Sequence, residues 1–183
     1  MRRVIAHLNP DRFVSGTIGQ PGERIFFLQV KTGENLISVI VEKSQVAILS
    51  ERIDTLLNQI MSENSNSASI PKNFDVDKLD LEPLDSPITE EFRVGIMSLG
   101  WSMLKNKLII EAHADTSETV PEIDSEATEG PDVLRIHISP QEGRNFAERG
   151  RRLVSEGRQV CPFCQEPLGQ GGHICARANG YKR

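Results

Sequence analysis

The sequence is poor in aromatic residues and has no long hydrophobic run. Phe, Trp and Tyr make up 5% of the 183 residues, with a single Trp and a single Tyr. Apolar runs such as Leu36–Val41 are far shorter than the roughly 20 residues needed to span a bilayer. Two arginines follow Met1, but no apolar stretch of signal-peptide length comes after them. We therefore expect a globular cytoplasmic protein without a membrane partner.

Cysteine is missing from the first 160 residues, and all three cysteines lie near the C-terminus as Cys161, Cys164 and Cys175. With no cysteine elsewhere to pair across a core, disulfides are not expected. The clustering fits a reducing compartment and metal binding.

The cysteines and His173 form the pattern Cys-x2-Cys-x8-His-x-Cys. Zinc favours tetrahedral coordination by thiolate and imidazole, and four protein ligands leave no open position for a substrate. The pattern therefore predicts a structural zinc site made of Cys161, Cys164, His173 and Cys175. Such a site would fold a segment that has little apolar content of its own.

Other interpretations of this tail remain open. Cys161-Pro162-Phe163-Cys164 resembles a glutaredoxin-type redox motif, although such a motif normally opens a helix after a strand. A nucleic-acid-binding zinc knuckle has a Cys-x2-Cys-x4-His-x4-Cys spacing, which differs from this one. A chance grouping of free cysteines is the third reading.

The rest of the chain predicts an α+β fold of two units, each with three strands followed by a helix. Alternating apolar residues indicate the strands, and apolar residues at three- and four-residue steps indicate the helices. The sheet should be mainly antiparallel, with both helices on one face. The expected strands are 13–18, 24–31, 36–42, 89–98, 103–114 and 133–139, and the expected helices are 44–61 and 140–157.

The two units match at an offset of 97 residues, which suggests an internal repeat. This offset aligns Glu51-Arg52 with Glu148-Arg149. We expect one domain at 1–158, with halves 1–75 and 88–158, and a zinc-knuckle-like module at 159–183. Whether the strands form one six-stranded sheet or two packed halves stays open. Residues 115–132, named the acidic loop below, contain seven acids and no base, a composition that indicates local disorder.

Charge is unevenly distributed along the chain. Residues 1–143 carry 13 basic and 23 acidic side chains, whereas residues 144–183 carry 8 basic and 3 acidic ones. The basic part could meet an acidic protein, nucleic acid, or the acidic body of the same chain. With the arginines of the second helix pointing outward, candidate phosphate or nucleic-acid contacts are Arg144, Arg149, Arg151, Arg152, Arg177, Lys182 and Arg183.

An enzyme hypothesis rests on Glu111 and His113 of one predicted strand and Arg135 and His137 of the next. Each pair shares a strand face, so pairing of the strands could bring the histidines together as an acid and a base. The simpler interpretation is the solvated face of an antiparallel sheet. A concave pocket around the four side chains would favour the enzyme, and an open wet face would argue against it.

The tail residues Cys161–Cys164, Gly172–Cys175 and Asn179–Arg183, together with the opening Phe13–Thr17, resemble an uncharacterised bacterial family of unknown function. That resemblance covers essentially the whole chain and implies no reaction, substrate or partner. We expect a non-enzymatic, zinc-stabilised binding or adaptor protein. The alternatives are an enzyme acting on a phosphorylated or nucleotide-like substrate through the sheet histidines, and a nucleic-acid-binding protein using the basic helix and tail.

Overall fold

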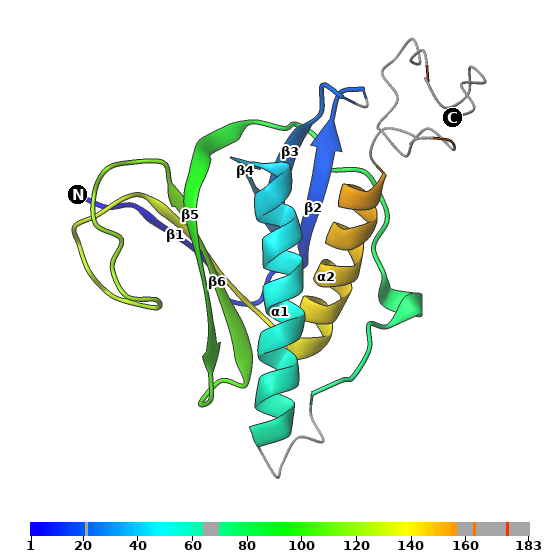
Figure 1. Cartoon of the computed structure of the whole chain (residues 1–183). Coiled ribbons are helices and arrows are strands. Elements are labelled where there is room, and N and C mark those ends of the chain that lie inside the picture. Colours follow the sequence, from blue (N-terminus) through cyan, green and yellow to red (C-terminus); the bar gives the residue numbers. More distant parts are fainter. Residues whose placement is uncertain (21, 64–69, 157–162, 164–174, 176–183) are drawn as a thin grey trace, which may run out of the picture.

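A computed structural model describes residues 1–20, 22–63, 70–156, 163 and 175. Within these residues the chain forms strands, two helices and a short 3-10 turn (Figure 1). In chain order they are β1 (Val4–His7), β2 (Arg12–Ile18), β3 (Ile25–Thr32), β4 (Asn35–Val41), α1 (Lys43–Glu63), η2 (Val76–Lys78), β5 (Glu90–Ser102), β6 (Lys107–Ala114), β7 (Val133–Ile138) and α2 (Pro140–Ser155).

All the strands belong to one seven-stranded sheet in the order β1-β7-β6-β5-β4-β3-β2. Two pairings, β1 with β7 and β4 with β5, are parallel, and the other four are antiparallel. The expected α+β class is confirmed, and the strands of both units share one sheet. Most pairings are antiparallel, as expected, but the two parallel pairings, which were not predicted, make the sheet mixed. β1 was not predicted.

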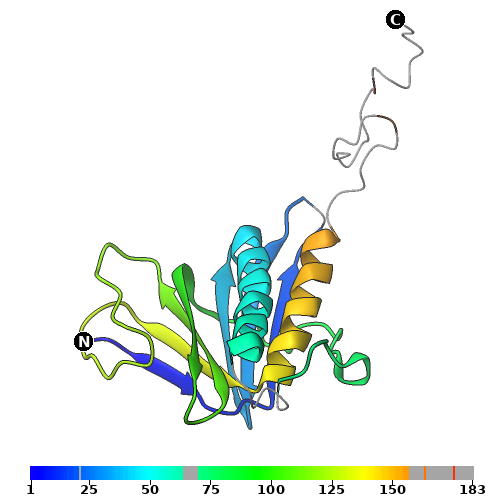
Figure 2. The same cartoon turned by 60° about the horizontal axis from the view of Figure 1, so that its bottom comes forward.

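Both helices cover the same face of the sheet and lie side by side (Figures 1 and 2). Alternation along the strands sends every second side chain toward them, including Leu28, Val39, Ile110 and Ile136, which are fully buried in the core beneath the helices. The other strand positions face away from the helices.

Close packing of the helices depends on small residues of α2. A Cβ atom at Gly143 would collide with Leu108 of the sheet, and one at Gly150 would collide with Ser50 of α1. The contacts run in opposite directions along the chain, since Gly150 lies near Val46 and Gly143 lies near Leu57. The two helices are therefore antiparallel.

The N-terminus of α2 shows the capping box expected from Ser139, Pro140 and Glu142. The Ser139 hydroxyl accepts a hydrogen bond from the Glu142 amide, and the Glu142 carboxylate accepts one from the Ser139 amide. This cap fixes the point at which the chain leaves β7 and turns onto the helical face.

The acidic loop contains neither helix nor strand, and it packs against the sheet. Ile123 lies over Gly100 of β5, where an added Cβ would come within 3.0 Å of Ile123 Cδ1. Arg2 holds the end of the loop: its amide donates to Thr128 O at 2.9 Å and its Nε donates to Pro131 O at 3.1 Å. The loop is thus tied to the N-terminus, which lies beside it (Figure 1). These contacts hold the loop in a defined position, in contrast to the local disorder that its composition suggested.

Candidate functional site

Four polar side chains of β6 and β7 come together on the face of the sheet that points away from the helices. Glu111 and Arg135 are direct partners in the antiparallel register, and Arg135 Nε lies 2.6 Å from Glu111 Oε1. His113 follows on the same face of β6, with its Nε2 3.2 Å from Glu111 Oε2. His137 follows Arg135 on β7. The sequence therefore identified a true cluster.

The prediction that these side chains lie on a solvated sheet face is wrong, because they are buried. Glu111 and His113 are 0% exposed, His137 is 1% exposed and Arg135 is 5% exposed. The physical reason is the acidic loop, which returns across this face of the sheet. The four side chains form a closed polar layer. The structure therefore shows neither the concave pocket expected for an enzyme nor the open wet face expected otherwise.

The acidic loop is held down by hydrogen bonds to the polar layer. The Asp124 amide donates to Glu111 Oε1 at 3.0 Å, and Arg135 Nη2 donates to the carbonyl oxygen of Ser125 at 2.7 Å. The Asp124 carboxylate lies 3.3 Å from His137 Nε2 and 3.5 Å from Arg135 Nη1. Backbone and side chain of Asp124 both reach into the site.

Both histidines of the layer are held in the neutral form. Burial lowers the pKa of His113, aided by the nearby charges of Arg2 and Arg135 and opposed by Glu111. Burial likewise lowers the pKa of His137, with Asp124 opposing the change. A neutral imidazole can accept a proton, which is what a general base requires, whereas a general acid would need the protonated form that the lowered pKa disfavours.

Several buried polar atoms of the layer, and one of the neighbouring Arg2, have no hydrogen-bond partner among the described residues. They are Arg2 Nη2, Glu111 Oε2, His113 Nδ1, His113 Nε2 and His137 Nε2. His113 Nε2 and Glu111 Oε2 are near each other but lack the geometry of a hydrogen bond. Buried polar groups are normally hydrogen-bonded, so such a concentration under one loop is unusual.

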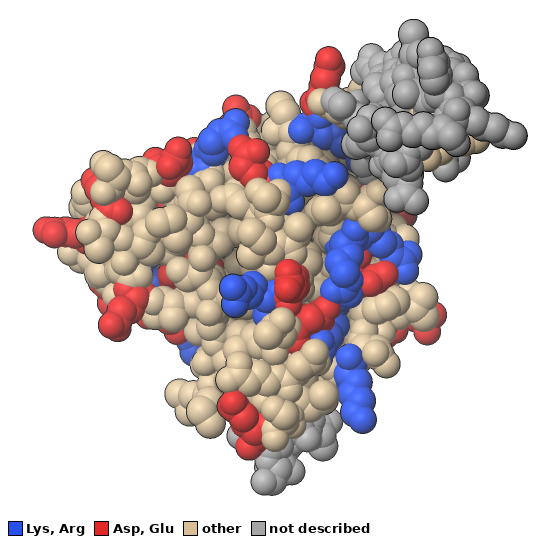
Figure 3. All heavy atoms as spheres, viewed as in Figure 1, with Lys and Arg blue, Asp and Glu red and all other residues tan. Residues whose placement is uncertain are grey.

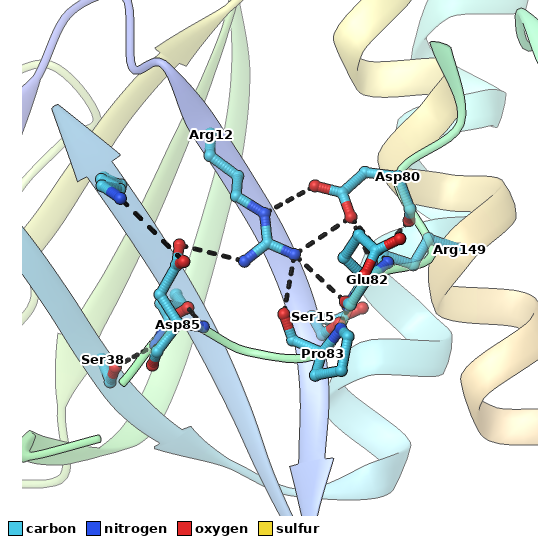
Figure 4. Close-up of polar contacts among 10 residues, drawn as sticks. Arg12, Ser15, Ser38, Asp80, Glu82, Pro83, Asp85 and Arg149 are labelled. Atoms are coloured by element: carbon cyan, nitrogen blue, oxygen red, sulfur yellow. Dashed lines mark hydrogen bonds and ion pairs between the residues drawn. The ribbon is translucent and has the colours of Figure 1, made fainter. Parts of the chain in front are cut away.

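A second cluster joins Arg12 of β2, Arg149 of α2 and residues 80–85, named the edge segment here (Figure 4). Arg12 donates from Nε to Asp80 Oδ2 at 2.6 Å and from Nη1 to Asp85 Oδ2 at 3.1 Å. Arg149 donates from Nε to Ser15 O at 2.6 Å and from Nη2 to Glu82 O at 2.7 Å. The two guanidinium groups therefore fasten the edge segment across β2, the outer strand of the sheet.

The electrostatics of this second cluster fit a structural role. The hydrogen bond from Arg12 lowers the pKa of the Asp80 carboxyl, which stays ionised. Arg149 is only 7% exposed, and its burial lowers the pKa of its guanidinium. A cleft of about 240 Å³ opens beside this cluster, lined by residues that include Phe13, Phe146 and Asn145. The rings of Phe13 and Phe146 stack at 4.5 Å between centroids.

The predicted outward arginines of α2 divide into two groups. The expectation is wrong for Arg149 and for Arg144, which is 4% exposed and donates to Asp54 Oδ1 at 2.6 Å and Asn58 Oδ1 at 2.7 Å. Arg151 and Arg152 are partly exposed and pair with Glu148, and Arg151 also pairs with Asp54. On this face basic side chains lie next to acidic ones (Figure 3).

The predicted zinc ligands Cys161, Cys164 and His173 lie outside the described residues, as do Arg177, Lys182 and Arg183. Cys175 is described and is 7% exposed. Within the part of the chain that the structure describes, no group of three or more His, Cys, Asp or Glu side chains is arranged to hold a metal ion.

The chain was compared with families and with individual proteins. A family described as "Protein of unknown function (DUF3090)" matches residues 6–175. The chain belongs to this family. No curated protein and no solved structure matches it. For the described part of this DUF3090 chain, no helix is both long enough and apolar enough to cross a membrane.

The most informative partners of the polar layer were not found from the sequence. Asp124 and Ser125 belong to a loop whose composition gave no sign of contact with the sheet, and Arg2 precedes a strand that was not predicted. The alternation of β6 and β7 did identify the shared face. Only the long-range return of the acidic loop turns that face into a site in this DUF3090 protein.

Proposed function

We propose that this DUF3090 protein is a non-enzymatic binding or adaptor protein of the bacterial cytoplasm, stabilised by a structural zinc ion at Cys161, Cys164, His173 and Cys175. The observation that carries the proposal is the ligand set itself, three thiols and an imidazole within fifteen positions of one tail. The burial of Cys175 fits a ligand withdrawn from solvent. Zinc would supply only folding energy there, since four protein ligands close its coordination shell.

A non-enzymatic role is supported by the internal use of polar groups in the described domain. Arg144 and Arg149, two of the candidate phosphate contacts, bind carboxylates and carbonyl oxygens of the protein itself. Binding of an acidic protein or nucleic acid would therefore fall to Arg151, Arg152, Arg177, Lys182 and Arg183. Nucleic-acid binding through these residues predicts strongly salt-dependent retention on DNA or RNA.

The enzyme alternative keeps one specific observation in its favour. Glu111, His113, Arg135 and His137 do converge, and burial lowers the pKa of both histidines. A phosphorylated or nucleotide-like substrate would have to pass the acidic loop to reach them. The alternative therefore requires loop movement before any chemistry.

Zinc binding is tested by elemental analysis of the purified protein and of two variants at adjacent positions. Cys164→Ser removes a proposed ligand, whereas Phe163→Ser changes an exposed side chain (59% exposed) between the two cysteines. We expect about one zinc per chain in the unchanged protein and in Phe163→Ser, and clearly less in Cys164→Ser. Equal zinc content in all three, or zinc far below one per chain in the unchanged protein, would refute the site.

A further inference from the structure

We propose that Arg135 and His137 form a binding site for the carboxylate of a small molecule, and that Asp124 of the acidic loop occupies this site as an internal competitor. The site lies on the face of the sheet away from the helices. It is independent of the zinc proposal, because the zinc ligands lie in the tail and none of them takes part here.

The first argument is the loose fit of Asp124. Its Oδ1 lies 3.5 Å from Arg135 Nη1 and 3.3 Å from His137 Nε2. Charge-assisted hydrogen bonds normally measure about 2.7–2.9 Å between nitrogen and oxygen. The other nitrogens of the same guanidinium make contacts that are this short or shorter, at 2.6 Å to Glu111 Oε1 and 2.7 Å to Ser125 O. Arg135 Nη1 and His137 Nε2 thus face a carboxylate without binding it closely.

The second argument is the set of buried polar atoms without a hydrogen-bond partner among the described residues. His137 Nε2 is one of them, and Glu111 Oε2 and both ring nitrogens of His113 lie in the same layer, with Arg2 Nη2 near His113. Burying a polar group without a hydrogen bond is unfavourable. A ligand carboxylate seated closer than that of Asp124 would give His137 Nε2 the hydrogen-bond partner that it lacks.

Charge balance selects a carboxylate over a phosphate. Asp124 places one carboxylate beside Arg135 and His137, while the charges of Arg2 and Lys105 also act on the two histidines. A ligand carboxylate that replaces Asp124 leaves the charge of this region unchanged. A dianionic phosphate would add one further negative charge to a buried region, where charges are poorly screened.

The position of Asp124 makes it displaceable. Its side chain is 34% exposed, whereas those of Arg135 and His137 are 6% and 2% exposed, so Asp124 lies on the solvent side of the site. A ligand arriving from solvent therefore meets Asp124 first and competes with it, which weakens the apparent affinity of the unchanged protein.

Acetate is a suitable probe, because it carries the proposed chemistry and little else. Asp124→Ala removes the internal competitor, and Glu126→Ala removes a charge from an exposed neighbouring position of the same loop. Titration at constant ionic strength, with chloride as the counter-salt, is followed by the melting temperature and by the ring nitrogen resonances of ¹⁵N-labelled histidine. We expect acetate to bind Asp124→Ala at least about tenfold more tightly than the unchanged protein or Glu126→Ala, with His137 as the responding histidine. Equal affinities in the three proteins would overturn the proposal.

Two further measurements distinguish a ligand site of the unchanged protein from acetate that merely fills the cavity left by the Asp124→Ala substitution. In the unchanged protein, high acetate should increase hydrogen exchange of the amides around Asp124 as the loop is displaced. No increase, despite binding to Asp124→Ala, would mean that Asp124 is a fixed structural group, and the proposal would fail. Phosphate titrated in the same way should bind more weakly than acetate, and preferential phosphate binding would overturn the carboxylate assignment. Asp124→Asn serves the same purpose if Asp124→Ala does not fold.

Discussion

At the scale of single residues, this protein buries charged and titratable groups on both faces of its sheet. Arg144 and Arg149 lie on the helical side, and Glu111, His113 and Arg135 lie on the other. Charged groups are rarely buried unless they are paired, and here each arginine is matched by carboxylate or carbonyl oxygens. The buried histidines make the stability of the domain sensitive to pH, because burial lowers the pKa of both.

We expect acidification to destabilise the protein through His113 and His137. Burial lowers the pKa of both in the folded state, so the unfolded chain takes up their protons first as the pH falls below about 6.5. The stability associated with the neutral histidines is complete above about pH 6.5 and is lost as the pH falls toward the folded pKa. Each histidine contributes a slope of up to about 1.4 kcal/mol per pH unit within that window.

Urea unfolding between pH 7.5 and pH 5.5 measures this slope. The double variant His113→Gln/His137→Gln should show a weaker loss of unfolding free energy on acidification than the unchanged protein. His7 remains in both proteins, and burial lowers its pKa as well, so part of the slope should persist. Identical slopes would show that the two buried histidines do not titrate on unfolding.

At the scale of secondary-structure elements, the antiparallel pair of α1 and α2 depends on the small residues of α2. Gly143 allows α2 to lie directly on Leu108 of β6. The contacts also bear on the predicted internal repeat. Val46 lies near Gly150, and Ile53 lies near Gly143. At the offset of 97 residues, Val46 corresponds to Gly143 and Ile53 corresponds to Gly150, so the two contacts are equivalent. The repeat stays a prediction, and this reciprocity supports it.

We expect Gly143→Ala to destabilise the protein, although alanine favours a helix over glycine by up to about 1 kcal/mol. The added methyl group meets Leu108, which is fully buried, and overpacking of a core costs about 1–3 kcal/mol. Leu108→Val should shorten the obstructing side chain. In a double-mutant cycle the two substitutions together should cost less than the sum of their separate costs. Strict additivity, or a stabilising Gly143→Ala, would contradict the packing argument.

The sequence predicted the elements better than their arrangement. Alternation located six of the seven strands in the part of the chain that the structure describes, but Val4–His7 is too short for alternation to identify. The parallel pairings of β1 with β7 and β4 with β5 depend on where separate segments meet, which local patterns do not encode. The same limit applies to the site: Glu111 and His137 were placed on one face, while their burial depends on a loop whose acidic composition suggested exposure.

At the scale of the whole molecule, the described sheet and helices all lie within residues 1–156. Every strand pairing and the packing of α1 on α2 belong to this part. It corresponds to the domain expected at 1–158, whose separation from the module at 159–183 remains a prediction.

A chain shortened to residues 1–158 should therefore fold alone. We expect cooperative unfolding, an unchanged circular dichroism spectrum apart from the tail, and a melting temperature within about 4 °C of the full chain, equivalent to about 1 kcal/mol. Aggregation or a broad, non-cooperative transition would show instead that the tail is part of the same folding unit. The Phe163→Ser variant of the full chain controls for nonspecific effects of changing the tail.

The edge segment has a consequence for how copies of this protein meet one another. An outer strand with free backbone groups is a template on which a strand of another molecule can extend the sheet. At β2 the carbonyl oxygen of Ser15 is already bound by Arg149, and Leu84 of the edge segment covers Gly16. A neighbouring chain therefore cannot pair with β2 at Ser15 and Gly16, which hinders edge-to-edge addition of another molecule while Arg12 and Arg149 hold the edge segment in place.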